Sequence, residues 1–155
     1  MRIFCTHSEP NFALPWTISK QRSSTSTGWI LRYNRVNFIC TNAHSVTDSA
    51  VVEVRRYGDD AKFLANVLCV CPDGDLAILE VVDPSFWRER TDEDDTVIAA
   101  PQPLKLRKVL PRLREEVSVI GFPVGGDNLS VTSGIVSRVD LQDYSNGSLS
   151  LLAVQ

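Results

Sequence analysis

His44 is the first residue whose type and position indicate chemistry. It lies in the stretch FICTNAHSV, residues 38–46, directly after an apolar run, and the chain has only two histidines. An imidazole at the end of a strand that we predict to be buried is awkward, because both ring nitrogens need hydrogen-bonding partners. The small residues around it would let a substrate approach the ring. His44 is therefore either a core histidine with satisfied nitrogens or a working base.

Asp75 is the candidate partner of that base. It lies in CPDGDLAILE, after a Pro-Asp-Gly turn and at the start of a strongly apolar strand. A carboxylate on the Nδ1 of a histidine fixes the tautomer of the ring and stabilises the imidazolium that forms when the other nitrogen accepts a proton. On residue pattern alone the alternative stays open, since Asp75 is equally well explained as a turn residue.

Short strands separated by turns must position these two residues. Tyr57-Gly58-Asp59-Asp60 predicts one hairpin turn, and Asn146-Gly147 predicts another. The nearly continuous apolar run DLAILEVV is typical of a strand buried on both faces. Many short strands at regular spacing predict an all-β barrel or sandwich. The predicted core of the first strand group contains Val52, Val54, Phe63, Val67, Leu76 and Ile78.

The strands fall into two groups. We expect an N-terminal arm at residues 1–24 that carries a solvated His7, a first barrel at 25–82, a connector at 83–116 and the start of a second barrel at 117–155. The connector holds the acidic run TDEDD and the basic run LKLRKVLPRLREE. Because charges of both signs lie close together there, a solvated connector is favoured over a phosphate site.

Composition excludes some classes of function. The net charge is −3, so nothing points to nucleic acid or an anionic membrane as a partner, and no apolar stretch reaches membrane-spanning length. The four cysteines form no CxxC pair. Cys69 and Cys71 share one face of a predicted strand, where their side chains run parallel, so we expect buried, reduced thiols rather than a disulfide or a zinc site.

Several motifs together resemble one family. TNAHSV resembles the histidine motif of the HtrA/Deg (protease Do-like) trypsin-like serine proteases, and DLAILE resembles their aspartate motif. VSVIGFPVGGDNLSVTSGIVSRVD resembles the segment that those proteases carry between the aspartate and the serine. EPNFALPW and SFW are similar to the plant and algal Deg branch. The resemblance runs over nearly the whole chain and in the same order.

This resemblance implies a chymotrypsin-like double β-barrel, with the first barrel complete, the second partial and the site in the cleft between them. His44 would act as general base and then as general acid, and Asp75 would orient it. The chain order of the triad in a fold of this class is His, Asp, Ser. The resemblance implies no metal and no organic cofactor.

The nucleophile of the family is missing from these residues. It lies in a Gly-Asn-Ser-Gly-Gly motif whose backbone amides also form the oxyanion hole, and no such motif occurs here. Ser133 corresponds to a strand serine of the family, and Ser148 belongs to the predicted hairpin. Because SLLAVQ resembles the strand that leads into the serine loop, we expect the chain to be truncated and the nucleophile to lie beyond Gln155.

The expected function is that of a serine endopeptidase acting on unfolded or damaged polypeptides, represented by a fragment without its nucleophile. The alternative is a catalytically inactive β-barrel pseudoprotease used for binding or assembly. We expect polypeptide substrates, a homo-oligomer for the full-length protein, no nucleic acid and no membrane span. Plant-type members of the family occupy chloroplasts, mitochondria, peroxisomes and the nucleus, so an intracellular location is expected, with the chloroplast and the nucleus among the candidates.

Overall fold

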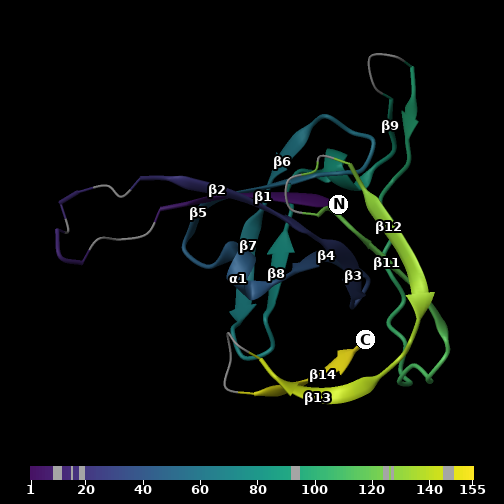
Figure 1. The fold of residues 1–155 in the computed structure, drawn as a ribbon. Helices are drawn as coiled ribbons and strands as arrows, with labels where there is room; N and C mark the ends of the chain where they lie inside the picture. The colour runs from purple at the N-terminus through teal and green to yellow at the C-terminus, as the bar shows by residue number, and fades with distance from the viewer. Residues whose placement is uncertain are drawn as a thin grey trace.

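The computed structural model describes residues 1–8, 12–14, 16–17, 20–91, 95–123, 126, 128–144 and 149–155. Strands dominate this part of the chain, and its helical elements are the short α1 (Ala43–Val46) and the 3-10 turn η1 (Pro84–Trp87). None of the helical segments described is both long and apolar enough to pass through a membrane. Figure 1 shows strands in every part of the molecule, as the all-β prediction requires.

Two four-stranded antiparallel sheets make up the first half of the molecule. In spatial order, the first sheet contains β2 (Arg22–Thr27), β1 (Arg2–His7), β5 (Ser49–Arg55) and β6 (Lys62–Leu64). The second sheet contains β3 (Trp29–Tyr33), β4 (Val36–Thr41), β8 (Leu76–Glu80) and β7 (Asn66–Cys71). The predicted turn at Tyr57-Gly58-Asp59-Asp60 is confirmed, because β5 and β6 pair antiparallel on either side of it.

Gly28 joins the two sheets where β2 passes into β3. A Cβ atom at this position would lie 2.6 Å from Cδ1 of Ile3 and 3.0 Å from Cγ2 of Ile39. Both isoleucines are fully buried, one in each sheet. The chain can therefore cross between the sheets at this point only with a residue that has no side chain.

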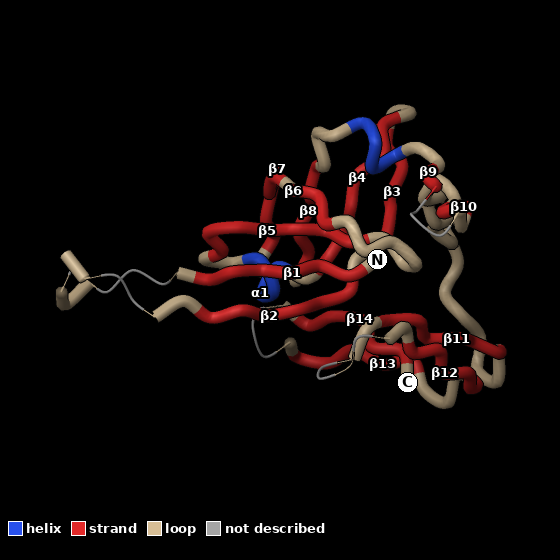
Figure 2. The backbone as a smooth tube through the Cα atoms, turned by 90° about the horizontal axis from the view of Figure 1, so that it is seen from above, coloured by secondary structure: helices blue, strands red, loops and turns tan. Residues whose placement is uncertain are grey.

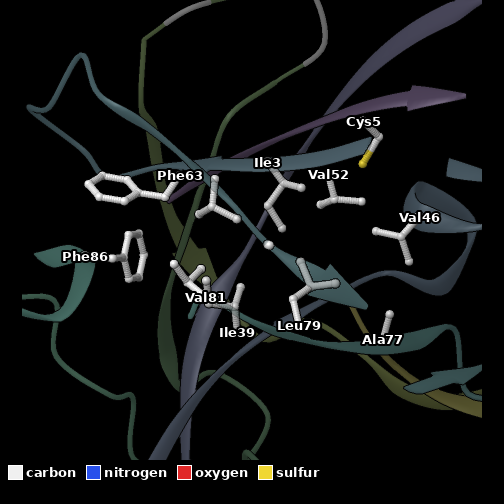
Figure 3. Close-up of a cluster of buried hydrophobic side chains, with 12 residues drawn as sticks. Ile3, Cys5, Ile39, Val46, Val52, Phe63, Ala77, Leu79, Val81 and Phe86 are labelled. Carbon is white, nitrogen blue, oxygen red and sulfur yellow. The ribbon is translucent and has the colours of Figure 1, made fainter. Parts of the chain in front are cut away.

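The main core lies between the inner faces of these two sheets. Figure 3 shows Ile3 and Val52 from the first sheet pointing toward Ile39 and Leu79 from the second. Phe63 and Phe86 pack edge to face at one end of the core, with ring centroids 5.2 Å apart. The buried cluster consists of Ile3, Cys5, Ile39, Val46, Val52, Val54, Phe63, Ala65, Ala77, Leu79, Val81 and Phe86.

The prediction for β8 was wrong about its faces. We expected both faces to be buried and placed Leu76 and Ile78 in the core, but the core-facing residues are Ala77 and Leu79. Leu76 is 50% exposed. Successive side chains of a strand point to opposite faces, and the second sheet is packed against the first on one face only, so the other set of apolar residues remains outside.

The segment that reads as one long strand, AKFLANVLCV, is two strands in different sheets. β6 ends at Leu64 and β7 begins at Asn66, and buried Ala65 forms the corner between them. Every residue of β7, an edge strand of its sheet, is exposed. The expected burial of Val67 was therefore wrong, whereas Val52, Val54 and Phe63 are buried as predicted.

Two segments outside the expected first barrel also contribute to it. β1, which we expected to belong to an N-terminal arm, lies between β2 and β5 and places Ile3 in the core. η1, at the start of the expected connector, contributes fully buried Phe86. Long-range strand pairing places β1, and packing of Phe86 in the core places η1. Local sequence pattern carries no information about either contact.

A buried ion pair holds η1 against the hairpin of β5 and β6. Arg56 donates from Nε and Nη2 to Oδ2 of Asp59, at 2.9 Å and 2.6 Å, and its Nη1 donates to the carbonyl of Arg88 at 2.6 Å. Burial alone would raise the pKa of Asp59, but the bonds from Arg56 and from the backbone of Ala61 outweigh it and lower that pKa. Within the connector, the basic run from Leu104 to Leu113 is largely exposed, as predicted.

The second half consists of two β-hairpins. β11 (Glu116–Gly121) pairs with β12 (Ser130–Ile135), and β13 (Val139–Asp143) pairs with β14 (Ser150–Val154). Between the two halves lies one further strand pair, β9 (Arg90–Thr91) and β10 (Val97–Ile98). In Figure 2 the two hairpins lie together on one side of β1 and β2. The predicted turn at Asn146-Gly147 lies outside the described residues.

Polar contacts attach the later part of the chain to β2 and β3. Directly after β11, the backbone N–H of Phe122 donates to Oγ1 of Thr27 at 2.8 Å, and in the connector the N–H of Leu104 donates to the carbonyl of Ile30 at 2.9 Å. Apolar residues of β11 and β12 such as Val119, Ile120 and Val131 remain exposed.

The expected burial of Cys69 and Cys71 was wrong. Both are exposed on β7, whereas Cys5 and Cys40 are buried. All four are free thiols. Burial raises the pKa of the Cys5 thiol to about 11, so the thiolate that reacts with disulfide reagents is scarce there.

Thiol titration with Ellman's reagent checks this difference. We expect Cys69 and Cys71 to react in a fast phase and Cys5 and Cys40 to react only after denaturation. Cys69→Ser and Cys71→Ser should each remove part of the fast phase, whereas Cys5→Ser should leave it unchanged. A fast phase that survives both β7 substitutions would contradict the described burial.

Truncation of Leu79 tests the location of the core. Leu79→Ala should lower the free energy of unfolding by about 2–5 kcal/mol, because a fully buried side chain leaves a cavity. Leu76→Ala makes the same change on the same strand, but on the outer face, and should cost no more than ~0.5 kcal/mol. Urea unfolding followed by tryptophan fluorescence measures both, and equal losses would place the core elsewhere.

Candidate active site

Register between β4 and β8 brings His44 and Asp75 together. In this antiparallel pair Thr41 lies opposite Ala77. Because the partners of an antiparallel pair move in opposite directions along the chain, the residues just after Thr41 lie beside the residues just before Ala77. The apolar strands of the two motifs thus place their polar ends next to each other.

α1 holds His44 at the surface beside the core. Asn42 is extended and precedes the helix, and the N–H of Thr47 donates to the carbonyl of Ala43 at 3.0 Å at its end. Val46 belongs to the buried core cluster, so this single turn is anchored by packing. The side chain of His44 is 53% exposed, which leaves its ring accessible.

Asp75 closes the turn that leads into β8. Its N–H donates to the carbonyl of Pro72 at 3.1 Å, and its φ of 47° lies in the left-handed region. Aspartate is one of the residues that tolerate this region. The side chain is only 7% exposed, so the carboxylate needs hydrogen-bond donors from the protein.

His44 supplies two of those donors. Its Nδ1 lies 2.9 Å from Oδ1 and 2.8 Å from Oδ2 of Asp75, and its backbone N–H donates to Oδ1 at 2.9 Å. An ionised carboxylate only accepts hydrogen bonds, so Nδ1 carries the proton in this arrangement. The ring of His44 thus pairs with the carboxylate of Asp75 and stays half exposed, so His44 is not a core histidine.

Two further donors were not predicted from the sequence. Nδ2 of Asn42 donates to Oδ2 of Asp75 at 2.9 Å, and the hydroxyl of Tyr144 donates to the same oxygen. The place of Asn42 in the TNAHSV stretch could have marked it as a candidate, whereas the sequence around Tyr144 contains no signal that points to Asp75. Burial by itself raises the pKa of Asp75, but the bonds from Tyr144, His44 and Asn42 outweigh it and lower the pKa to about 2.

An open cavity of about 600 Å³ adjoins the pair and is lined in part by His44 and Asp75. Arg22, Asp48 and Thr47 contribute to its walls. His7, which we expected to be solvated, also lines it. Its Nε2 lies 2.7 Å from Oγ of Ser24, and its Nδ1 lies 3.1 Å from the carbonyl of Thr47, because β1 is part of the sheet. Ser133 is not among the described residues that line the cavity.

Ser133 lies on β12, where its Oγ is 3.2 Å from Oγ of Ser118 on the neighbouring strand. Ser148 lies outside the described residues. Within the described ranges, no three side chains of His, Cys, Asp or Glu form a group that could hold a metal ion.

Comparison with known protein families agrees with this geometry. Residues 26–152 match the trypsin-like peptidase domain, which is most of the chain. The chain belongs to the trypsin-like peptidase family. Protease Do-like 2, chloroplastic, of Arabidopsis thaliana is 41% identical over the whole chain, and Protease Do-like 4, mitochondrial, of the same plant is 36% identical. The chain spans 23% and 27% of the lengths of these two relatives.

Solved structures show the same fold in more distant proteins. The active form of the Rv3671c protease from M. tuberculosis has a TM-score of 0.62 at 22% identity, with 99% of this chain and 56% of that chain covered. An HtrA-type protease, AlgW with a decapeptide, has a TM-score of 0.64 at 16% identity, with 99% and 46% covered. The chymotrypsin-like, all-β fold class that we expected is thereby confirmed.

Substitution of Asp75 tests the electrostatics of the site. Because the pKa of Asp75 is lowered from 3.8 to about 2 by folding, its ionised form contributes stability above pH 3.8 that is lost as the pH falls through 2. Asp75→Asn removes the titrating group. We expect wild type to exceed this variant in free energy of unfolding at pH 6, and the difference to shrink toward pH 2.

Asp60→Asn provides the matched control. The Asp60 side chain is fully exposed, and its contact with Nη1 of Arg55 is long, at 3.9 Å. Urea unfolding at a series of pH values measures all three proteins. A difference between wild type and Asp75→Asn that stays constant with pH would contradict the lowered pKa.

Proposed function

We propose that this chain carries the general base and its orienting carboxylate for a serine endopeptidase. The observation that supports this most directly is the pairing of Nδ1 of His44 with the carboxylate of Asp75 at 2.8–2.9 Å. With Nδ1 occupied, Nε2 of a half-exposed ring is the nitrogen that can exchange a proton. This is the arrangement in which a histidine serves as base and then as acid in acyl transfer to serine.

Each residue has a defined part in that reaction. Nε2 of His44 accepts the proton of the attacking serine hydroxyl and later delivers it to the leaving amine. Asp75 keeps the proton on Nδ1 and stabilises the imidazolium between the two steps. The nucleophile and the oxyanion donors are not among these 155 residues, since no Gly-Asn-Ser-Gly-Gly motif occurs in them. Chemistry therefore requires a polypeptide that includes such a segment.

The proposed substrates are unfolded or damaged polypeptides, and the proposed assembly of the full-length protein is a homo-oligomer. The substrate class is supported by the relatives, which are named as proteases of the Do-like group, and by an HtrA-type fold neighbour that was solved with a decapeptide. The homo-oligomer rests on the resemblance to the HtrA/Deg family alone. Relatives named chloroplastic and mitochondrial support an organelle as the compartment, and the chloroplast is our choice because the 41% identical relative bears that name. We propose no nucleic-acid partner.

A catalytically inactive barrel used for binding or assembly is the second candidate function. These 155 residues carry no Gly-Asn-Ser-Gly-Gly motif, which fits either function, because the chain spans 23% of its 41% identical relative. The two functions differ in one respect that can be measured. The enzyme gains activity when a segment with the serine motif is supplied, whereas the pseudoprotease does not.

Casein hydrolysis distinguishes them. We expect no hydrolysis by the purified 155-residue chain, because losing the serine costs as much as losing the whole triad, about 10⁶-fold in subtilisin, and the oxyanion hole is absent as well. A version extended through a Gly-Asn-Ser-Gly-Gly motif should be active. In that version His44→Ala should lower kcat by about 10⁶-fold and Asp75→Asn by about 10⁴-fold.

Leu76→Ala, a change on the outer face of β8, serves as the control in the extended version and should retain activity. If the extended version were inactive although folded, the pseudoprotease would be the better reading. Activity of the 155-residue chain that His44→Ala abolishes would mean that a nucleophile lies elsewhere in this sequence.

A further inference from the structure

Tyr144 makes a contact that joins the two halves of the molecule at the site. It follows β13 directly, and its hydroxyl donates to Oδ2 of Asp75, which lies 69 residues earlier in the chain. Figure 1 shows the end of β13 coming up to the turn between β7 and β8, where Asp75 lies. The backbone N–H of Tyr144 donates to the carbonyl of Leu149 at 3.3 Å, which ties the tyrosine to the start of β14.

The hydroxyl completes the set of donors around the carboxylate. Asp75 accepts from the backbone N–H and the ring of His44, from the amide of Asn42 and from Tyr144. A carboxylate has about four lone-pair sites, so these four donors occupy its capacity. Three of them come from Asn42 and His44, which belong to the first half of the molecule. Only Tyr144 is supplied by the second half.

We propose that Tyr144 is a positioning residue for the His44–Asp75 pair: its hydroxyl fixes the rotation of the Asp75 carboxylate, and thereby the orientation of the His44 ring. The proposal rests on the proposed function, because it assigns Tyr144 a part in the same reaction. Tyr144 is not among the described residues that line the cavity beside His44. It acts through Asp75 and has no role toward the substrate.

The physical argument concerns the bond between Nδ1 and the carboxylate. Nδ1 of His44 lies at nearly equal distances from both oxygens of Asp75, 2.9 Å and 2.8 Å, so this bond alone does not select one rotation of the carboxylate. Oδ1 is held by the backbone N–H of His44, and Oδ2 is held by Asn42 and Tyr144. Without the hydroxyl of Tyr144, Oδ2 keeps the amide of Asn42 and the Nδ1 of His44, which it shares with Oδ1.

A consequence is that the site depends on the docking of the second half. Tyr144 reaches Asp75 only while the hairpin of β13 and β14 lies against the first-half sheets. Among the hydrogen bonds that lower the pKa of Asp75, the one from Tyr144 contributes most. The other ionisable groups around the cavity are His7, Arg22, Asp48 and His44. Substitution of Tyr144 changes none of these groups. A change in the pKa of Asp75 therefore reports the loss of the Tyr144 hydroxyl.

The test is an NMR titration of the Asp75 carboxyl carbon in the ¹³C-labelled 155-residue chain. In Tyr144→Phe we expect the pKa of Asp75 to rise from about 2 toward its ordinary 3.8, because a bond to the ionised form is lost. Tyr33→Phe is the matched control. It makes the same change at a tyrosine that is 65% exposed at the end of β3, and it should leave Asp75 unchanged. An unchanged pKa in Tyr144→Phe would overturn the proposal.

A second variant covers the case in which Tyr144→Phe does not fold. Incorporation of 3,5-difluorotyrosine at position 144 keeps the ring and the hydroxyl and makes the hydroxyl a stronger donor. While the phenol is protonated, it should draw charge from the carboxylate and move the Nδ1–H proton resonance of His44 upfield. A resonance at its wild-type position would also overturn the proposal.

Both readouts are independent of peptide hydrolysis, so they separate this proposal from the proposed function. If the titration responds but the extended version of the chain has no casein activity, Tyr144 positions a pair that is not catalytic. If Asp75→Asn lowers casein hydrolysis but neither Tyr144 variant alters Asp75 or His44, the proposed function stands and the role of Tyr144 falls.

Discussion

The antiparallel pairing of β4 with β8 is the constraint on which the site depends. Thr41 lies opposite Ala77, and this register places the residues that follow β4 beside the turn that precedes β8. A slip of one residue would turn Leu79 out of the core and move Asp75 away from His44, because side chains alternate between the faces of a strand. Core packing and site geometry are therefore specified by the same register.

Burial at this junction explains the chemistry of the pair. The carboxylate of Asp75 is almost fully buried, which by itself disfavours its charge, yet four donors keep it ionised. His44 lies beside it on a single helical turn whose Val46 is packed in the core, so the ring is anchored at its base and open at its outer edge. A rigid carboxylate beside an accessible imidazole is the combination that general base catalysis requires.

Much of this was predictable from the sequence, and the errors have a common cause. Turn residues and short apolar runs identified many of the strands, and the stretches around His44 and Asp75 identified the candidate pair. Two predictions about strands were wrong, since β1 was expected to belong to an arm and AKFLANVLCV was read as one strand. The other wrong predictions concern burial. Leu76 was placed in the core and Cys71 among buried thiols, although the first points outward and the second lies on an edge strand. An apolar run shows that a strand exists, but which of its faces is covered depends on a partner sheet that is distant in sequence.

The sequence by itself determined the all-β class, several of the strands and the two residues whose types suit acid–base chemistry, because these follow from local pattern and from motifs that are contiguous in the chain. Only the tertiary structure decided that β1 is a central strand, that His7 lines the cavity and that Tyr144 completes the donors of Asp75. Each of these facts arises from contacts between segments far apart in the chain. Such contacts are set by how sheets pair and pack, and no short stretch of residues encodes them.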